Sequence, residues 1–186
     1  MARSRSDPAE RRARHAAVDD PGVVMEAAAT FLGVRPRSVH ETRRRLIHHG
    51  YREELVEGVL ERLVEMGYLD DEGFARAWIE SRDRSRPRGE DALRRELSLK
   101  GIDRDTIVAA LADRAREPPA DDGAESAAAE PTSADRAAAE RLLERRRETL
   151  LRDADPRKRQ QRAYALLARN GFDPQTCQEV SARLLK

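Results

Sequence analysis

The sequence predicts an all-α protein made of three tandem three-helix repeats. Apolar residues recur at helical spacing along most of the chain, and Gly and Pro separate these stretches. The order helix, helix, Gly turn, helix occurs three times, which is typical of repeat proteins. Charged residues form 38% of the chain and aromatic residues 4%, which favours small helical units over one large core. We expect an elongated, curved array, although the sequence is also compatible with compact packing.

The first repeat is predicted over residues 20–67, after an N-terminal tail, residues 1–19. The tail is polar and lacks apolar periodicity, so we expect it to be disordered. Asp20-Pro21 offers an N-cap followed by Pro at the first helical position, and Ser38 begins a capping box for the second helix. The third helix ends at a Gly and places these apolar residues on one face: Leu55, Val56, Val59, Leu60 and Leu63.

The second repeat is predicted over residues 68–116. Asp70 is placed to cap its first helix, which carries Phe74 and Trp78 on the expected core side. Trp78 lies four residues after Phe74 and could be a core residue or a nucleotide-stacking platform, of which the core position is the commoner role. We therefore expect Trp78→Ala to open a core cavity costing about 3–5 kcal/mol.

An acidic linker, residues 117–135, precedes the third repeat, residues 136–186. The linker holds six acidic residues, three Pro and no Lys or Arg, a composition typical of flexible segments. Its central alanines also allow transient helix. In the third repeat we expect a helix from about residue 134 to 151, followed by two helices that repeat the Asp-Pro start signal.

Three glycines mark equivalent turns in the repeats: Gly50, Gly101 and Gly171. A Leu lies four residues before each one, at Leu46, Leu97 and Leu167. A large apolar residue follows each one directly, at Tyr51, Ile102 and Phe172, and a core-sized residue lies six positions after it, at Val56, Ile107 and Cys177. This pattern predicts a left-handed Gly at each helix C-terminus, sealed by the apolar residue after it.

Bulk charge identifies no partner, because the formal net charge is only +1. The cations are nearly all Arg, since only three of the 36 Lys and Arg residues are Lys. Arg presents a planar fork of donors that matches phosphate and carboxylate, although GC-rich coding would produce the same bias. The single Cys177 cannot form an internal disulfide, and no apolar run is long enough to span a membrane. With no secretory signal at the N-terminus, we expect a soluble cytoplasmic protein.

No catalytic, cofactor or metal site is predicted. The sequence has no Gly-rich phosphate loop and no Cys/His cluster with metal-ligand spacing. His40, His48 and His49 lie among arginines, which is a poor environment for a metal ion. Asp70-Asp71 could suggest paired catalytic carboxylates, but an N-cap followed by a first-turn acid explains them better. Cys177 is expected to pack in the core rather than to act as a reactive thiol.

Arginines gather in three places that are candidate partner-binding surfaces. An interhelix break with alternating Arg could present several guanidiniums to a phosphate row or an acidic protein groove, whereas a solvated face with i,i+4 partners explains any single Arg equally well. The candidates for binding a partner protein or DNA are Arg43, Arg44, Arg82, Arg84, Arg86, Arg88, Arg94, Arg95, Lys100, Arg157, Lys158 and Arg159.

The junction of the first and second repeats reads Gly67-Tyr68-Leu69-Asp70-Asp71, followed by Phe74-Ala75-Arg76-Ala77-Trp78, and a later turn reads Lys100-Gly101-Ile102. These stretches resemble the RecX family. The resemblance covers roughly residues 22–186. It implies structural roles for the motif residues Gly67, Tyr68, Leu69, Asp70, Asp71, Phe74, Trp78 and Gly101. Thr42, where the family commonly has Leu, and the long acidic insert are departures.

The resemblance implies helix-turn-helix-like domains and a non-enzymatic regulator of the RecA recombinase. Such a regulator would bind along a RecA–DNA filament as a monomer and limit its extension, ATPase, strand exchange and co-protease activities. Homologous recombination, DNA repair and the SOS response would be modulated in this way. Direct action on DNA is the alternative, and weak, nonspecific binding to single- or double-stranded DNA fits both hypotheses. A scaffold without a nucleic-acid role and an enzyme are less favoured.

Overall fold

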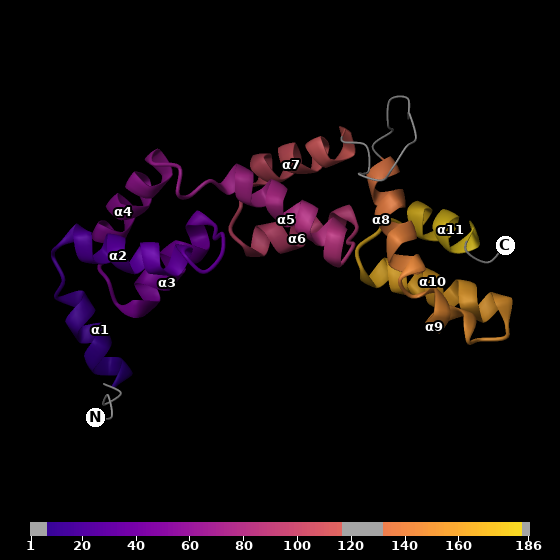
Figure 1. The fold of residues 1–186 in the computed structure, drawn as a ribbon, viewed down its shortest axis with the longest axis horizontal. Coiled ribbons are helices and arrows are strands. Elements are labelled where there is room, and N and C mark those ends of the chain that lie inside the picture. Colours follow the sequence, from indigo (N-terminus) through magenta and orange to yellow (C-terminus); the bar gives the residue numbers. More distant parts are fainter. Residues whose placement is uncertain (1–6, 117–131, 184–186) are drawn as a thin grey trace. The chain divides into compact units, whose positions relative to one another are not determined.

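The computed structural model describes residues 7–116 and 132–183, and these residues form only helices and connecting turns (Figure 1). The all-α prediction is therefore confirmed. The helices are α1 Pro8–Ala16, α2 Pro21–Leu32, α3 Val39–His49, α4 Glu53–Glu65, α5 Asp71–Ser85, α6 Glu90–Leu99, α7 Arg104–Arg116, α8 Thr132–Glu144, α9 Arg147–Leu151, α10 Pro156–Arg169 and α11 Pro174–Arg183. Within these ranges no helix is long and apolar enough to cross a bilayer.

The chain divides into two compact units, and the first consists of Met1–Phe74 together with Lys100–Ile102. Helices α2, α3 and α4 of this unit pack around one apolar core. Helix α4 contributes the apolar face that the sequence spacing predicts, with Val56, Val59, Leu60 and Leu63 buried. The buried residues of this core are Val24, Ala28, Leu46, Tyr51, Val56, Val59, Leu60, Leu63 and Leu69.

The second unit consists of Ala75–Leu99 and Asp103–Lys186 and contains two groups of three main helices. Helix α6 packs with α7, and side chains of α5 contact both of them. Helix α8 packs with α10 and α11, while the short α9 lies against α10. The second of these groups has its own core, formed by Ala138, Ala139, Leu143, Leu150, Ala163, Leu167, Phe172, Cys177 and Val180.

The three equivalent glycine turns are confirmed. Gly50, Gly101 and Gly171 have φ angles of 99°, 79° and 82°, in the left-handed region that a side chain would strain. The N–H of Tyr51 bonds to the carbonyl of Leu46 at 3.3 Å, which is the long bond of a Schellman cap. The residues four before, one after and six after each Gly are all buried.

The N-terminal tail is a correction, because residues 8–16 form helix α1. The carboxylate of Asp7 accepts a hydrogen bond from the N–H of Ala9, and Pro8 occupies the first turn. This is the same Asp-Pro start that precedes α2, α10 and α11. The helix has no buried residue, so the apolar spacing on which the prediction relied is absent. Residues 1–6 lie outside the described ranges.

The boundary of the acidic linker is a second correction. Residues 117–131 lie outside the described ranges, but α8 begins at Thr132 and Asp135 is buried. The single helix expected from about residue 134 to 151 is divided into α8 and α9, with a turn at Arg145 and Arg146. The turn allows Leu150 to reach the core and Arg145 to reach the carboxyl end of α5.

Trp78 is only partly buried, which contradicts its predicted core position. The buried positions on this helix are Phe74, Ala75 and Ile79, at 7%, 0% and 3% exposure. Ile79 therefore fills the place that the prediction gave to Trp78. The indole lies at the margin of the core, where its N–H can reach a polar partner, so the expected core cavity of Trp78→Ala does not apply.

Candidate partner-binding surface

The N-terminus of α3 is bound by residues that the sequence places in the second repeat. Ser38 Oγ accepts the N–H of Glu41 at 3.0 Å and donates to the carbonyl of Lys100 at 2.6 Å. Asp71 Oδ1 accepts the N–H of Val39 at 2.9 Å. The start signal of the second helix of repeat one is thus completed by two segments that follow much later in the chain. Asp71 is a capping acid for α3 as well as a first-turn residue of α5.

Lys100 forms an ion pair with Glu41, with Nζ and Oε1 2.7 Å apart. Burial acts to raise the pKa of Glu41, but the hydrogen bond and charge of Lys100, and then Arg35, lower it below the ordinary 4.5. A Cβ at Gly101 would collide with the side chain of His40, so only Gly fits there. Lys100 and Gly101 therefore hold a turn against α3, and Lys100 has a partner within the chain.

The motif before α5 has a clear structural basis. Asp70 Oδ1 accepts the N–H of Gly73 at 2.9 Å, which confirms the predicted cap. Gly67 has φ 73° at the end of α4, and Leu69 is 1% exposed in the core of the first unit. Tyr68 is different, because 69% of it is exposed. Its ring contributes no core packing and remains available to a partner.

The alternating arginines at the predicted break between α5 and α6, which we call the elbow, are Arg82, Arg84, Arg86 and Arg88. Two of them contact one carboxylate of α6. Arg82 Nε donates to Glu96 Oε2 at 2.6 Å while its guanidinium lies over the Trp78 ring, 4.3 Å from the centroid. Trp78 Nε1 donates to the same oxygen at 2.9 Å. Arg88 approaches Glu96 Oε1 at 3.4 Å and also donates to the side-chain oxygen of Asn170, the residue that follows α10. Arg82 and Arg88 thus make internal contacts that a partner would have to replace.

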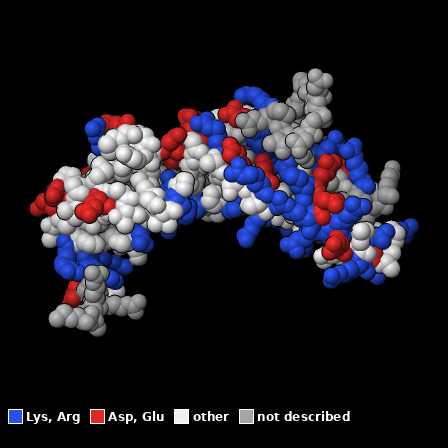
Figure 2. Space-filling view, viewed as in Figure 1, with Lys and Arg blue, Asp and Glu red and all other residues white. Residues whose placement is uncertain are grey.

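The remaining elbow and α6 arginines point to solvent. Arg86 and Arg95 are exposed and make no ion pair or side-chain hydrogen bond within the described ranges. Arg84 has an exposed i,i+4 pair with Glu80, and Arg94 has exposed pairs with Glu90 and Asp91 of its own helix. Such pairs contribute at most about 0.5 kcal/mol, so a partner can displace them. Figure 2 shows Lys and Arg densely grouped over this part of the second unit.

The other two arginine clusters also contain both paired and unpaired side chains. Arg43 is paired with a glutamate of α4 at 2.5 Å, whereas Arg44 beside it is exposed and unpaired in the described structure. Arg157 and Lys158 are exposed in the first turn of α10, and no described acid pairs with them. Arg159 is half-buried and donates to a backbone carbonyl at 3.3 Å. The readily available cations are therefore a subset of those that the sequence suggests.

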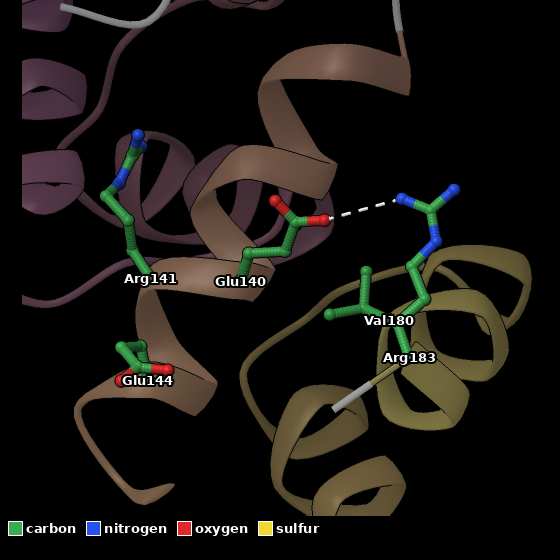
Figure 3. A pocket seen from close by; sticks show the side chains of 5 residues that line it. All are labelled: Glu140, Arg141, Glu144, Val180 and Arg183. Carbon is green, nitrogen blue, oxygen red and sulfur yellow. Dashed lines mark ion pairs between the residues drawn. The ribbon is translucent and has the colours of Figure 1, made fainter. Parts of the chain in front are cut away.

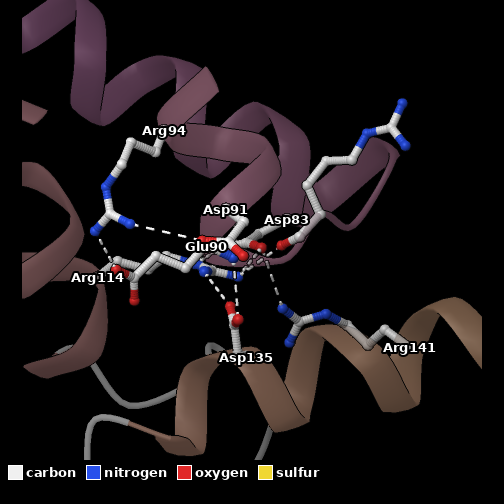
Figure 4. A network of polar contacts seen from close by, with 8 residues as sticks. Asp83, Glu90, Asp91, Arg94, Arg114, Asp135 and Arg141 are labelled. Atoms are coloured by element: carbon white, nitrogen blue, oxygen red, sulfur yellow. Dashed lines mark hydrogen bonds and ion pairs between the residues drawn. The ribbon is translucent and has the colours of Figure 1, made fainter. Parts of the chain in front are cut away.

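Sequence reasoning missed a buried polar network centred on Arg114 of α7 (Figure 4). Its guanidinium donates to Asp83 of α5 at 2.8 and 2.9 Å, to Asp135 of α8 at 2.6 Å and to the carbonyl of Arg88 at 3.2 Å. Asp135 also accepts the N–H of Glu90, at the start of α6, at 3.0 Å. The network joins both helix groups of the second unit.

Burial and the opposite charges of this network act against each other on the pKa values of its members. Burial acts to lower the pKa of Arg114, but the hydrogen bond and charge of Asp83, together with Asp135, raise it. Burial raises the pKa of Asp135, against the opposing charge of Arg114. In the sequence, Asp135 lies three residues after Thr132, where α8 begins, but it follows a run of acidic residues and was therefore assigned to the linker.

A surface depression of about 430 Å³ lies between α8 and α11 (Figure 3). Its charged lining residues include Glu140 and Arg183, which form an ion pair at 3.7 Å, and it has no nucleophile. Within the described ranges no group of three or more His, Cys, Asp or Glu could hold a metal ion. Cys177 is buried, as predicted, and burial raises the pKa of its thiol to about 11.

The fold defines a class of protein made of three tandem three-helix domains. Family models of the first, second and third three-helix domains of RecX match residues 25–63, 70–111 and 134–180. The chain belongs to the RecX family.

Curated relatives agree with this assignment. The chain is 36% identical over 150 residues to a "Regulatory protein RecX" of Mycobacterium sp. (strain JLS), covering 81% of this chain and 75% of the relative. It is 34% identical over 156 residues to the protein of the same name from Mycobacterium tuberculosis (strain ATCC 25177 / H37Ra), covering 83% and 82%.

Solved structures share the fold. The crystal structure of RecX from Lactobacillus salivarius superimposes with a TM-score of 0.70 at 18% identity, covering 89% of this chain and 97% of that one. A second crystal structure, of regulatory protein RecX, gives a TM-score of 0.69 at 19% identity, covering 98% and 81%.

Proposed function

We propose that this protein is a non-enzymatic regulator that binds the RecA nucleoprotein filament as a monomer. It limits filament extension and the ATPase, strand-exchange and co-protease activities by occupying the filament surface. Homologous recombination, DNA repair and the SOS response are modulated as a consequence. The observation that carries this proposal is the match of all three domains to the RecX family.

The arrangement of cations supports a surface-binding role. Arg84, Arg86, Arg94 and Arg95 are exposed on α5, on α6 and between them, and none has a strong internal partner. Arginines of this kind can bind carboxylates of a protein groove or phosphates of DNA, and they speed encounter with an acidic partner. Tyr68 adds an exposed aromatic ring in the first unit, of the type that is enriched at protein interfaces.

The test is a titration of the protein into a RecA–single-stranded DNA ATPase assay at fixed DNA. The expected result is inhibition at a protein concentration far below that which coats the naked DNA, because a filament-binding regulator acts on the assembled polymer. Inhibition that appears only once the naked DNA is coated would instead support simple competition by a helix-turn-helix-like DNA-binding protein.

Variants locate the interface in the same assay. Arg86→Ala/Arg95→Ala removes two exposed guanidiniums without breaking an internal ion pair, so it should weaken inhibition about tenfold while helicity is unchanged. The matched control is Arg152→Ala/Arg169→Ala, which removes two other exposed and unpaired arginines of the same unit. Equal inhibition by the two double variants would exclude this surface from the interface.

A further inference from the structure

A pocket of about 480 Å³ lies between α1 and α3, entirely within the first unit. Apart from Pro8, every residue that lines it is basic, and no acidic side chain is among them. Figure 2 shows a separate group of Lys and Arg beside α1. The basic lining residues, which we call the α1–α3 pocket residues, are Arg11, Arg12, His15, Arg45, His48 and His49.

Direct contacts fix α1 beside α3 in this arrangement. His15 Nδ1 lies 2.7 Å from the backbone oxygen of His49, and because a carbonyl only accepts, Nδ1 carries the hydrogen. The His15 ring stacks on Tyr51 with centroids 4.4 Å apart. A Cβ at Gly50 would collide with the backbone of Arg12, so the absence of a side chain there allows the close approach.

No acidic side chain lies among the lining residues of this pocket to offset its positive charge. Arg11, Arg12 and Arg45 make no ion pair within the described ranges. Burial lowers the pKa of His49, and the neighbouring charges of Arg45, His15 and others lower it further. Like charges held this close oppose the docking of α1, and a bound anion would remove that repulsion.

We propose that the α1–α3 pocket is a binding site for a phosphate group. Three guanidinium forks and three imidazoles reach it from two helices, so donors can approach several oxygens of a tetrahedral anion at once. A carboxylate offers only two oxygens in one plane and would leave most of these donors unused. The phosphate is supplied either by a nucleic-acid strand or by a free polyphosphate, since both carry the same group.

Phosphate binding is coupled to proton uptake. The groups that face the pocket from α1 are Arg11, Arg12 and His15, and those from α3 are Arg45, His48 and His49, all of them basic. Burial and the neighbouring cations lower the pKa of His49, and an anion among these groups favours its protonated form, so binding takes up a proton and tightens as pH falls.

The test is calorimetry on the full chain with sodium tripolyphosphate as probe, at about pH 6 and about pH 8. We expect tighter binding at the lower pH, and a measured heat that depends on the buffer in the direction of proton uptake. Arg11→Gln/Arg45→Gln should weaken binding about tenfold or more. His48→Gln, which alters one exposed rim residue, should retain the fold and weaken binding.

The matched control is Arg62→Gln/Arg104→Gln, which removes the same charge from two exposed arginines outside the pocket and should leave binding unchanged. Equal affinity of the two double variants, or equally tight binding of a short poly-glutamate, would overturn the proposal. Competition by single-stranded DNA with and without a 5′-phosphate identifies the source. If only the phosphorylated strand competes, the ligand is a terminal phosphate, and if both compete it is the strand backbone. If neither competes, it is a free polyphosphate.

Discussion

Replacing Arg114 with Met removes the central cation of the buried network in the second unit. Arg114 is 8% exposed and contacts two carboxylates, of which Asp135 is 12% exposed and Asp83 is 21% exposed. Breaking a buried ion pair from one side typically costs about 3–5 kcal/mol, because the remaining charge is left uncompensated. Asp135 keeps the N–H of Glu90, and Arg141 remains 3.8 Å from Asp83, so we expect about 3 kcal/mol.

The assay is urea unfolding followed by tryptophan fluorescence. Trp78 is the only Trp and lies on α5, the helix that also carries Asp83, so its signal reports the second unit. Arg116→Met on the same helix breaks only an exposed pair with Asp113 and should change stability by less than about 0.5 kcal/mol.

A double-mutant cycle separates the ion pair from side-chain packing. In an Asp135→Asn background, Arg114→Met leaves one fewer uncompensated carboxylate, so its effect should be about 1–3 kcal/mol smaller than in the wild type. A loss of less than about 1 kcal/mol for Arg114→Met alone would refute the reasoning, because the network would then not stabilise the unit.

Three further outcomes are expected. Ile79→Ala should destabilise the second unit by about 2–5 kcal/mol, because the side chain is buried in the core. Trp78→Phe should cost only about 1 kcal/mol, through the lost hydrogen bond to Glu96. Equal losses of stability in chemical denaturation would contradict the assignment of Ile79, and not Trp78, to the core. Because the pKa of Glu41 is lowered in the folded state, its contribution to stability is complete above pH 4.5 and is lost as pH falls through the pKa of the folded protein. NMR titration of the Glu41 carboxyl should show the lowered pKa, and Lys100→Met should raise it. Cys177 should not react with a thiol reagent at about pH 8 until the chain unfolds, and rapid labelling of the native protein would contradict its burial.

Local signals in the sequence correctly predicted the positions of the equivalent turns in the three repeats. Each Gly turn depends on residues within about two helical turns of it, so spacing alone located Leu46, Tyr51 and Val56 around Gly50. Helix α1 shows the limit of apolar spacing. It buries no residue and is held by the contacts of His15 and Arg12 with α3, so only its Asp-Pro start could have revealed it.

The roles of the individual arginines could not be predicted, because their partners are distant in sequence. Arg82 and Arg88 look like Arg84 and Arg86 in the alternating elbow, yet they contact Glu96 on another helix. Nothing in the local pattern separates the inward pair from the outward pair. Asp135 was hidden in the same way, since its partner Arg114 lies across the acidic segment.

The difference between arginines with internal partners and arginines that face solvent changes which substitutions can test the proposed function. Replacing Arg84, Arg86 and Arg88 together would remove exposed charge and also a contact with Asn170 on α10, so lost inhibition would have two explanations. Arg86 and Arg95 make no internal ion pair in the described structure, so their loss alters the surface and leaves the contacts within the unit intact. A weaker inhibitor with unchanged stability would therefore assign binding energy to that surface, which the sequence pattern alone could not do.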